Sequence, residues 1–149
     1  MFSLKDIVLE LNKDKDNNEL HGHQDLLMKY NDLDWEYYKS FSHKKYKKNL
    51  VYRNDNYEIF IICWSPGQFS PIHNHPENGC IFKIIEGEMS EYRYNINLDL
   101  IELNNLTKDS IGYIDDKFGT HKMYNESNKT VVSLHIYSPP NFNAKIYKI

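Results

Sequence analysis

The hydrophobic pattern changes character about a third of the way along the chain. In the first part, apolar residues recur three or four positions apart, beginning with Phe2, Leu4, Ile7, Val8 and Leu11. This spacing predicts a helix, with Ser3 and Asp6 as its N-terminal capping signal. A polar, turn-rich stretch over residues 12–18 breaks the pattern, and further helices are predicted over residues 24–30 and 33–40.

After about residue 50, short runs rich in β-branched and aromatic residues, bounded by turn residues, replace the helical spacing. Strands are predicted over residues 50–53, 57–64, 81–85, 88–94, 100–103, 111–114, 119–123, 130–137 and 144–149. Many short strands at close spacing are typical of a β-sandwich or barrel. Because no repeat or linker interrupts them, we expect one domain over residues 1–149. A helical segment, 1–49, should pack on a barrel formed by 50–149.

Composition and charge narrow the functional classes. The chain has 149 residues, of which 40% are hydrophobic and 26% charged, so it is neither disordered nor a membrane protein. No run approaches the roughly 20 apolar residues that span a bilayer. The net charge of -3 argues against a nucleic-acid partner. The N-terminus lacks an apolar signal core, so we expect a cytoplasmic protein, and a monomer.

The richest stretch for chemistry lies between Gly67 and Gly87, which punctuate a strand–turn–strand unit. His73 and His75 are two residues apart, so an extended strand places both imidazoles on one face. Such a pair suits iron, zinc, copper or nickel better than calcium or magnesium. The alternative is that one histidine faces solvent and the other fills a polar pocket. Cys80 follows five residues later.

A third ligand must come from another part of the chain, and His121 is the candidate. It follows Gly119 and precedes Asn125 in a His-x3-Asn pattern. The alternative is an ordinary strand histidine. Three histidines without a carboxylate leave a divalent ion its full charge and open positions for anionic ligands and dioxygen. The expected substrate is therefore an anionic chelator, such as a thiolate with an adjacent amine.

Near the end of the chain, Ser133, His135 and Tyr137 alternate, so the three side chains share one face of a strand. If that face lines the barrel interior, these polar groups must be paired there. A purely structural hydrogen-bond network is the alternative interpretation. Ser138-Pro139-Pro140 then ends the strand, because proline cannot donate to the ladder.

Several of these blocks together resemble a known family. They are Tyr46-x-Lys48-Asn49-Leu50-Val51, Cys63-Trp64, His73-x-His75-x4-Cys80, Gly119-x-His121 and the closing run from Ser133 to Pro140. In order and spacing they resemble the cysteine dioxygenases of the cupin superfamily, and Cys80 stands where most metal-binding cupins carry glutamate. The resemblance runs from about residue 46 to residue 140. It implies a cupin-type β-barrel, also called a double-stranded β-helix or jelly roll.

The resemblance implies a mononuclear Fe(II) held by His73, His75 and His121. L-cysteine would bind through its thiolate and amine, and O2 would donate both atoms to the sulfur, giving cysteine sulfinic acid. Cys80 and Tyr137 match the pair that family members join in a thioether crosslink. His135 matches the histidine that holds the phenol, with Ser133 beside it.

One departure from the family concerns the substrate carboxylate. Lys48 stands where the family has an arginine, and a lysine offers a point charge rather than a bidentate fork. Tyr46 is the neighbouring substrate-binding candidate, and Arg53 is an alternative clamp. Strand alternation places residues 46, 48, 50 and 52 on one face and Arg53 on the other, so Lys48 is preferred. Two alternatives to a cysteine dioxygenase stay open. One is a dioxygenase for another small thiol, such as 3-mercaptopropionate or cysteamine, and the other is a non-catalytic cupin that binds a metal or small molecule.

Overall fold

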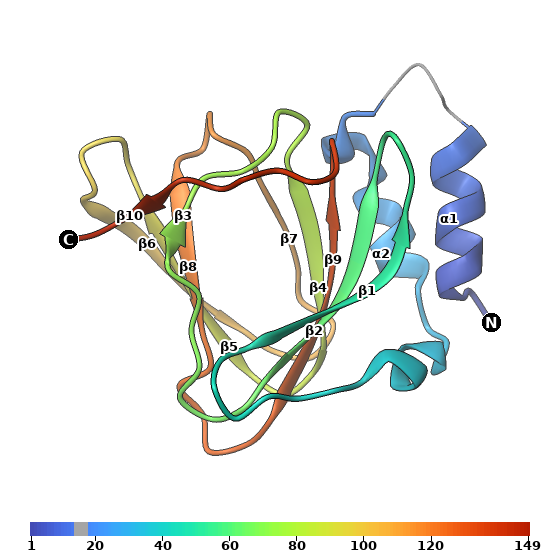
Figure 1. Ribbon diagram of the computed structural model, residues 1–149, viewed down its shortest axis with the longest axis horizontal. Helices are drawn as coiled ribbons and strands as arrows, with labels where there is room; N and C mark the ends of the chain where they lie inside the picture. Colours follow the sequence, from blue (N-terminus) through green and yellow to red (C-terminus); the bar gives the residue numbers. More distant parts are fainter. Residues whose placement is uncertain (14–17) are drawn as a thin grey trace.

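Two antiparallel sheets face each other and form a small barrel, with the helices on one side (Figure 1). The computed structural model describes residues 1–13 and 18–149. One sheet has the order β1 (Lys47–Arg53), β2 (Glu58–Trp64), β9 (Val131–Tyr137), β4 (Cys80–Glu86) and β7 (Ile111–Ile114). The other has the order β10 (Ile146–Tyr147), β3 (Ile72–His73), β8 (Thr120–Tyr124), β5 (Met89–Tyr94) and β6 (Leu100–Leu106). The prediction of a small, mostly β barrel preceded by helices is confirmed.

The N-terminal segment begins with α1 (Leu4–Lys13), η1 (Leu20–His23), α2 (Gln24–Lys29) and the short 3₁₀ helix η2 (Asp34–Tyr38). The predicted cap is present, because Ser3 N–H donates to Asp6 Oδ2 at 2.8 Å and Asp6 N–H to Ser3 Oγ at 3.1 Å. Part of the predicted break, residues 14–17, lies outside the described residues. The helical segment was expected to run to residue 49. It is shorter, because β1 already begins at Lys47.

The sheet that contains β2 is buried on both faces, which explains the nearly continuous apolar run in its sequence. Alternate residues of β2 serve two cores. The odd-numbered residues Ile59, Ile61 and Cys63 pack in the cluster that includes the helices, together with Leu27 and Trp35. The even-numbered residues Phe60, Ile62 and Trp64 pack inside the barrel. The helices therefore cover the outer face of this sheet and leave its inner face to the barrel (Figure 1).

A β-bulge in β1 changes which of its side chains share a face. Lys48 lies opposite Ile62 and Arg53 lies opposite Glu58, although Tyr52 lies opposite Ile59. Glu58 and Ile62 point the same way from β2, so Arg53 is on the face of Lys48. The prediction that strand alternation sends Arg53 to the other face is therefore wrong. Tyr52 instead packs towards the helices.

A buried lysine joins β4 to the end of α2. Lys83 Nζ donates to the carbonyl oxygens of Leu27 and Tyr30, each at 2.8 Å, and so satisfies acceptors that a helix C-terminus leaves open. We expect Lys83→Met to lower the free energy of unfolding by about 2–3 kcal/mol, because both buried carbonyls lose their donor. Chemical denaturation measures this. The control Lys29→Met removes only an exposed contact to Asp25 and should cost less than about 0.5 kcal/mol; equal losses would contradict the prediction.

No helix in the described ranges is long and apolar enough to cross a membrane.

Candidate metal centre

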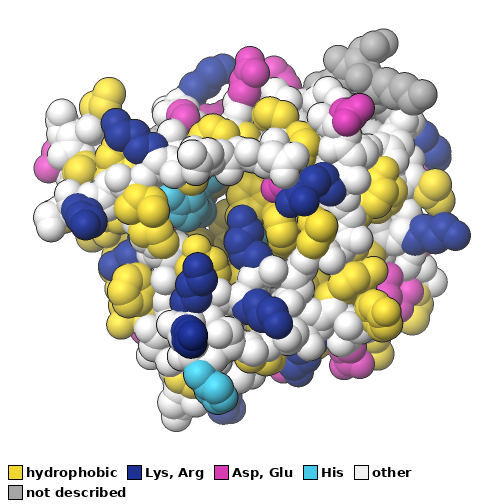
Figure 2. Space-filling model, viewed as in Figure 1, with side chains coloured by type: hydrophobic (Ala, Val, Ile, Leu, Met, Phe, Trp, Pro, Cys, Tyr) yellow, Lys and Arg dark blue, Asp and Glu magenta, His cyan; other side chains and the backbone are white. Residues whose placement is uncertain are grey.

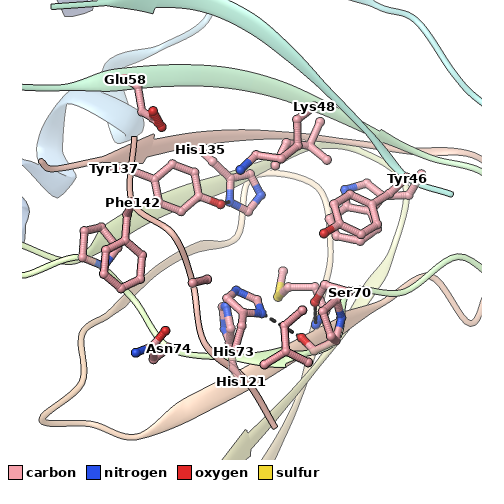
Figure 3. Close-up of a pocket in the computed structure, with 17 residues that line it drawn as sticks. Tyr46, Lys48, Glu58, Ser70, His73, Asn74, His121, His135, Tyr137 and Phe142 are labelled. Carbon is pink, nitrogen blue, oxygen red and sulfur yellow. Dashed lines mark hydrogen bonds between the residues drawn. The ribbon is translucent and has the colours of Figure 1, made fainter. Parts of the chain in front are cut away.

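A cavity of about 160 Å³ opens between the two sheets. Figure 2 shows the corresponding hollow on the surface, with Lys and Arg side chains standing around it. Its polar and charged lining residues come from both sheets and converge on the space (Figure 3). They include Tyr46, Lys48, Glu58, Ser70, His73, Asn74, His121, His135 and Tyr137. Most of the predicted site residues therefore meet in one place.

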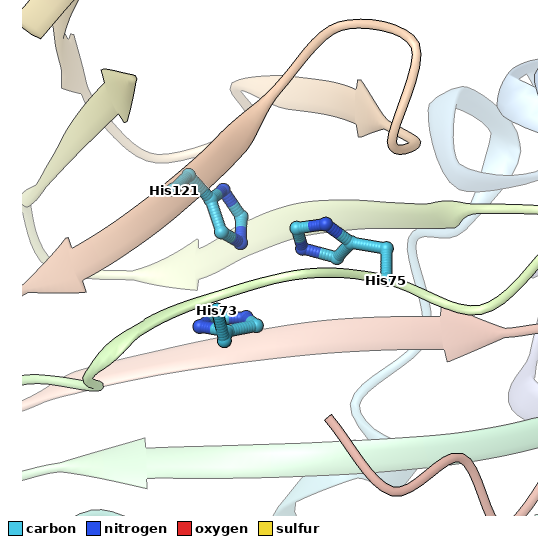
Figure 4. A group of neighbouring side chains, drawn as sticks. All are labelled: His73, His75 and His121. Atoms are coloured by element: carbon cyan, nitrogen blue, oxygen red, sulfur yellow. The ribbon is translucent and has the colours of Figure 1, made fainter. Parts of the chain in front are cut away.

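The three predicted histidines converge beside this cavity (Figure 4). His73 ends β3, His75 follows it in the chain, and His121 lies on β8 directly opposite His73. Their ring centroids are 4.5 to 4.9 Å apart, and one nitrogen from each ring lies within 4.8 Å of the other two. We call this group the three-histidine centre. It is able to hold one metal ion.

Neighbouring acceptors fix which nitrogen of two of these rings carries the proton. His73 Nδ1 lies 2.7 Å from the carbonyl oxygen of Pro71, which can only accept, so Nδ1 is the donor. His121 Nδ1 lies 2.8 Å from Glu91 Oε2 and donates to that carboxylate in the same way. Each ring therefore keeps an unprotonated Nε2, the form that binds a metal.

His75 provides the test of whether a metal fits. It is 2% exposed, and neither of its ring nitrogens has a hydrogen-bond partner. Asp116 Oδ1 lies 3.9 Å from Nδ1, too far for a hydrogen bond. Leaving a buried polar group unpaired costs free energy, and a metal ion would supply the missing partner. Burial and the neighbouring imidazoles hold the pKa of His75 well below its usual range, so the ring is neutral and suits a first-row transition metal.

A buried charge network supports His121 from behind. Glu91 is 1% exposed, and its Oε1 lies 3.0 Å from Arg93 Nε and accepts from Asn104 Nδ2 at 3.0 Å. Arg93 Nε forms an ion pair with Glu91 without a hydrogen bond, and Arg93 Nη2 donates to the carbonyl oxygen of Tyr113 at 2.9 Å. The network fixes the carboxylate and, through it, the orientation of the His121 ring. Sequence reasoning missed Glu91.

On the opposite wall, Ser133, His135 and Tyr137 share one face of β9, as predicted. Trp64 Nε1 donates to Ser133 Oγ at 3.0 Å, so the hydroxyl proton is free to donate to His135 Nε2 at 2.8 Å. His135 Nδ1 then carries a proton and faces Tyr137 Oη at 3.4 Å and Cys80 Sγ at 3.8 Å. Burial lowers the pKa of His135 to about 3, so the imidazole stays neutral. Its one N–H is directed at the phenol and the thiol.

Cys80 and Tyr137 lie directly opposite each other on β4 and β9. Cys80 is buried, and burial raises the pKa of its thiol. Burial, followed by the nearby Cys80, raises the pKa of Tyr137 well above its usual range. Both groups are therefore protonated at neutral pH. Side chains paired across neighbouring strands are within reach of each other.

The two preferred substrate-binding candidates reach the cavity from β1 and the residue before it. Tyr46 stacks on Trp64 with ring centroids 4.6 Å apart. Lys48 is exposed as a whole residue, but its Nζ lies over the rings of Phe60 and Tyr137, 4.5 and 4.9 Å from their centroids. Withdrawal of the ammonium from water lowers the pKa of Lys48.

Arg53, the alternative clamp, does not line the cavity. Its guanidinium contacts Glu58 Oε1 at 3.3 Å, and the same oxygen accepts the backbone N–H of Asn141 at 2.9 Å. Glu58 does line the cavity, which places a carboxylate in a pocket expected to bind an anion. Sequence reasoning missed this residue too. The Ser138-Pro139 peptide bond, whose isomer the sequence left open, is cis.

Comparison with known proteins points to one family. The sequence model of the family described as cysteine dioxygenase type I matches residues 3–148. Cysteine dioxygenase type 1 of Rattus norvegicus is 32% identical over 74% of this chain and 59% of its own length. The enzyme of the same name from Danio rerio is 29% identical over 93% of this chain and 75% of its own length. The chain thus spans about 59% of the length of the rat relative.

Solved structures support the fold. A protein with a double-stranded β-helix domain from Klebsiella pneumoniae superposes with a TM-score of 0.64 at 17% identity, covering 81% of this chain and 98% of that one. A protein from Thermus thermophilus gives a TM-score of 0.62 at 20% identity, covering 75% of this chain and 98% of that one. These likenesses show a cupin-type barrel. Together with the family match over nearly the whole sequence, they lead to one conclusion: the chain belongs to the cysteine dioxygenase type I family.

Proposed function

We propose that this protein is an Fe(II)-dependent thiol dioxygenase that adds both atoms of O2 to the thiol of L-cysteine, giving cysteine sulfinic acid. The observation that carries the proposal is the three-histidine centre, which offers three neutral nitrogens and no carboxylate beside a cavity that contains a phenol and an ammonium. The family match supports the reaction class. Iron bound by His73, His75 and His121 would supply the redox-active point where thiolate and dioxygen meet.

The other residues are proposed to bind and orient the substrate. Lys48 Nζ, held over Phe60 and Tyr137, would attract the carboxylate of cysteine. Tyr137 keeps its proton at neutral pH and can therefore donate a hydrogen bond from Oη into the cavity. His135 holds that phenol in place, because its own orientation is set by Ser133. A positioned donor of this kind acts on charge that develops during the reaction without having to reorganise.

Oxygen consumption by the purified protein loaded with Fe(II) tests the proposal. Cysteine, 3-mercaptopropionate and cysteamine should be supplied separately, and the products identified by mass spectrometry. We expect oxygen uptake with cysteine and a sulfinic acid product. A protein that consumes no oxygen with any small thiol would be a non-catalytic cupin.

A second candidate is a thiol dioxygenase for another small thiol. Lys48 favours it, because a single ammonium over two aromatic rings cannot hold a carboxylate with the two parallel hydrogen bonds of a guanidinium. A looser carboxylate contact relaxes the demand for cysteine. Uptake with 3-mercaptopropionate or cysteamine, but none with cysteine, would identify this candidate.

We also propose that Cys80 and Tyr137 become joined in a thioether bond. A bond forms between Sγ and a carbon of the phenol ring, the S–H bond and that ring C–H bond break, and dioxygen takes up the two protons and two electrons. The two residues face each other across β4 and β9, which gives the thiol access to the phenol ring. Protein that has turned over its thiol substrate should lose about two hydrogens in mass and migrate faster in a denaturing gel, because the bond closes a loop. Cys80→Ser should show neither change. A free Cys80 thiol after many turnovers would contradict the proposal.

A further inference from the structure

Glu58 is a buried carboxylate in the wall of the substrate cavity that no part of the proposed reaction uses. Its side chain is 7% exposed. Oε1 is held by Arg53 at 3.3 Å and by the backbone N–H of Asn141 at 2.9 Å. Arg53 reaches this oxygen because the bulge in β1 places Arg53 opposite Glu58, so that the two side chains point to the same face of the sheet. These contacts hold the carboxylate in a fixed position. Figure 3 shows Glu58 among the residues that line the cavity.

The carboxylate shares that wall with the ammonium of Lys48. Glu58 lies directly opposite Tyr137 on the neighbouring strand, and Lys48 Nζ lies 4.9 Å from the centroid of the Tyr137 ring. The two charges therefore stand around the same phenol. Within residues 1–13 and 18–149, no carboxylate, Glu58 included, forms an ion pair with Lys48. The ammonium is thus free to meet a ligand while it stays within the field of Glu58.

This arrangement affects thiols with and without a carboxylate differently. A substrate carboxylate placed at Lys48 is attracted by the ammonium and repelled by Glu58, and both interactions act in a partly desolvated site. A substrate without a carboxylate would leave an isolated ammonium unpaired, and sites usually reject analogues for that reason. With Glu58 present, the ammonium already has a counter-charge nearby, although the ion pair with Arg53 offsets part of that charge. The penalty for lacking the carboxylate is therefore smaller.

We propose that Glu58 is a specificity-determining residue that offsets Lys48 and opens the pocket to aminothiols without a carboxylate, such as cysteamine, in addition to cysteine. The inference rests on the proposed thiol dioxygenase function. It assigns this chain a wider substrate class than a clamp with a single positive charge would accept.

The test compares cysteine with cysteamine in the wild type and in Glu58→Gln, each loaded with Fe(II). The amide keeps an oxygen for Arg53 and Asn141 but removes the charge. We expect the wild type to turn over both thiols and Glu58→Gln to raise the ratio of kcat/KM for cysteine over cysteamine by about tenfold. Glu86→Gln removes the same charge from an exposed pair with Lys39 and should leave the ratio unchanged.

The dissociation constants of both thiols are measured in parallel, without oxygen, by titration calorimetry of the iron-loaded protein. Their ratio should shift in the same direction, because the effect acts on binding. If Glu58→Gln weakens both thiols equally, Glu58 only holds the wall together and the inference is wrong. Wild-type protein that turns over cysteine but neither binds nor turns over cysteamine also overturns it. Absence of turnover with every thiol overturns the proposed function, and the binding ratio then decides on Glu58.

Discussion

Replacing His75 by leucine is expected to abolish tight binding of divalent metal ions and, at the same time, to stabilise the metal-free protein. His75 is fully enclosed and both of its ring nitrogens lack partners. Leucine removes this buried polar group from the metal-free state, so the free energy of unfolding should rise by about 1–2 kcal/mol. Loss of one of the three proposed ligands should reduce oxygen uptake to the background rate.

Thermal unfolding with and without Fe(II) or Co(II), together with metal titration, measures both effects. Added metal should raise the melting temperature of the wild type, because a ligand bound only by the folded state stabilises it, and should leave His75→Leu unchanged. His43→Leu, at an exposed histidine, is the matched control and should retain metal binding. If His75→Leu destabilises the metal-free protein instead, the ring is a packing element and the argument from its unpaired nitrogens is wrong.

The parts of the site that the sequence predicts are those set by local geometry. The alternation of Ser133, His135 and Tyr137 follows from the two-residue period of an extended strand and places the three side chains on one face of β9. The spacing of His73 and His75 pointed to the same pair of ligands, but β3 ends at His73 and His75 lies just beyond the strand. The convergence of His121 with the other two rings depends on the pairing of β3 with β8, which no local pattern predicts. The choice of His121 came from its flanking residues and from their resemblance to a family motif.

The missed features all depend on tertiary contacts. The bulge in β1 turns Arg53 to the face of Lys48, and no residue type in that stretch indicates a bulge. Glu58 lies in a predicted strand, but its burial and its contacts with Arg53 and Asn141 depend on how the chain folds around it. Charged residues are almost never fully buried unless they are paired, and such pairs are visible only once the strands are placed. For Glu91 and Arg93 the one local signal was their alternation on a single strand.

Replacing Glu91 by glutamine is expected to have the second large effect, because its carboxylate contacts both Arg93 and the proposed metal ligand His121. The amide can offer its oxygen to His121 Nδ1 only by turning its NH2 group towards Arg93 and Asn104, which are donors as well. We expect metal affinity to fall by about 10- to 100-fold, as for other groups that orient a ligating histidine. The free energy of unfolding should also fall by roughly 3 kcal/mol, because a buried charge is left uncompensated.

A double variant separates the two effects. Glu91→Gln combined with Arg93→Met removes both charges, so most of the lost stability should return while the metal affinity stays low. Denaturation of the metal-free protein gives the first quantity and equilibrium metal titration gives the second. Glu102→Gln, on the exposed strand opposite Arg93, is the control and should change neither. If the double variant recovers metal affinity along with stability, Glu91 serves only to neutralise Arg93. If it recovers stability alone, the carboxylate itself holds His121 in the orientation that binds the ion.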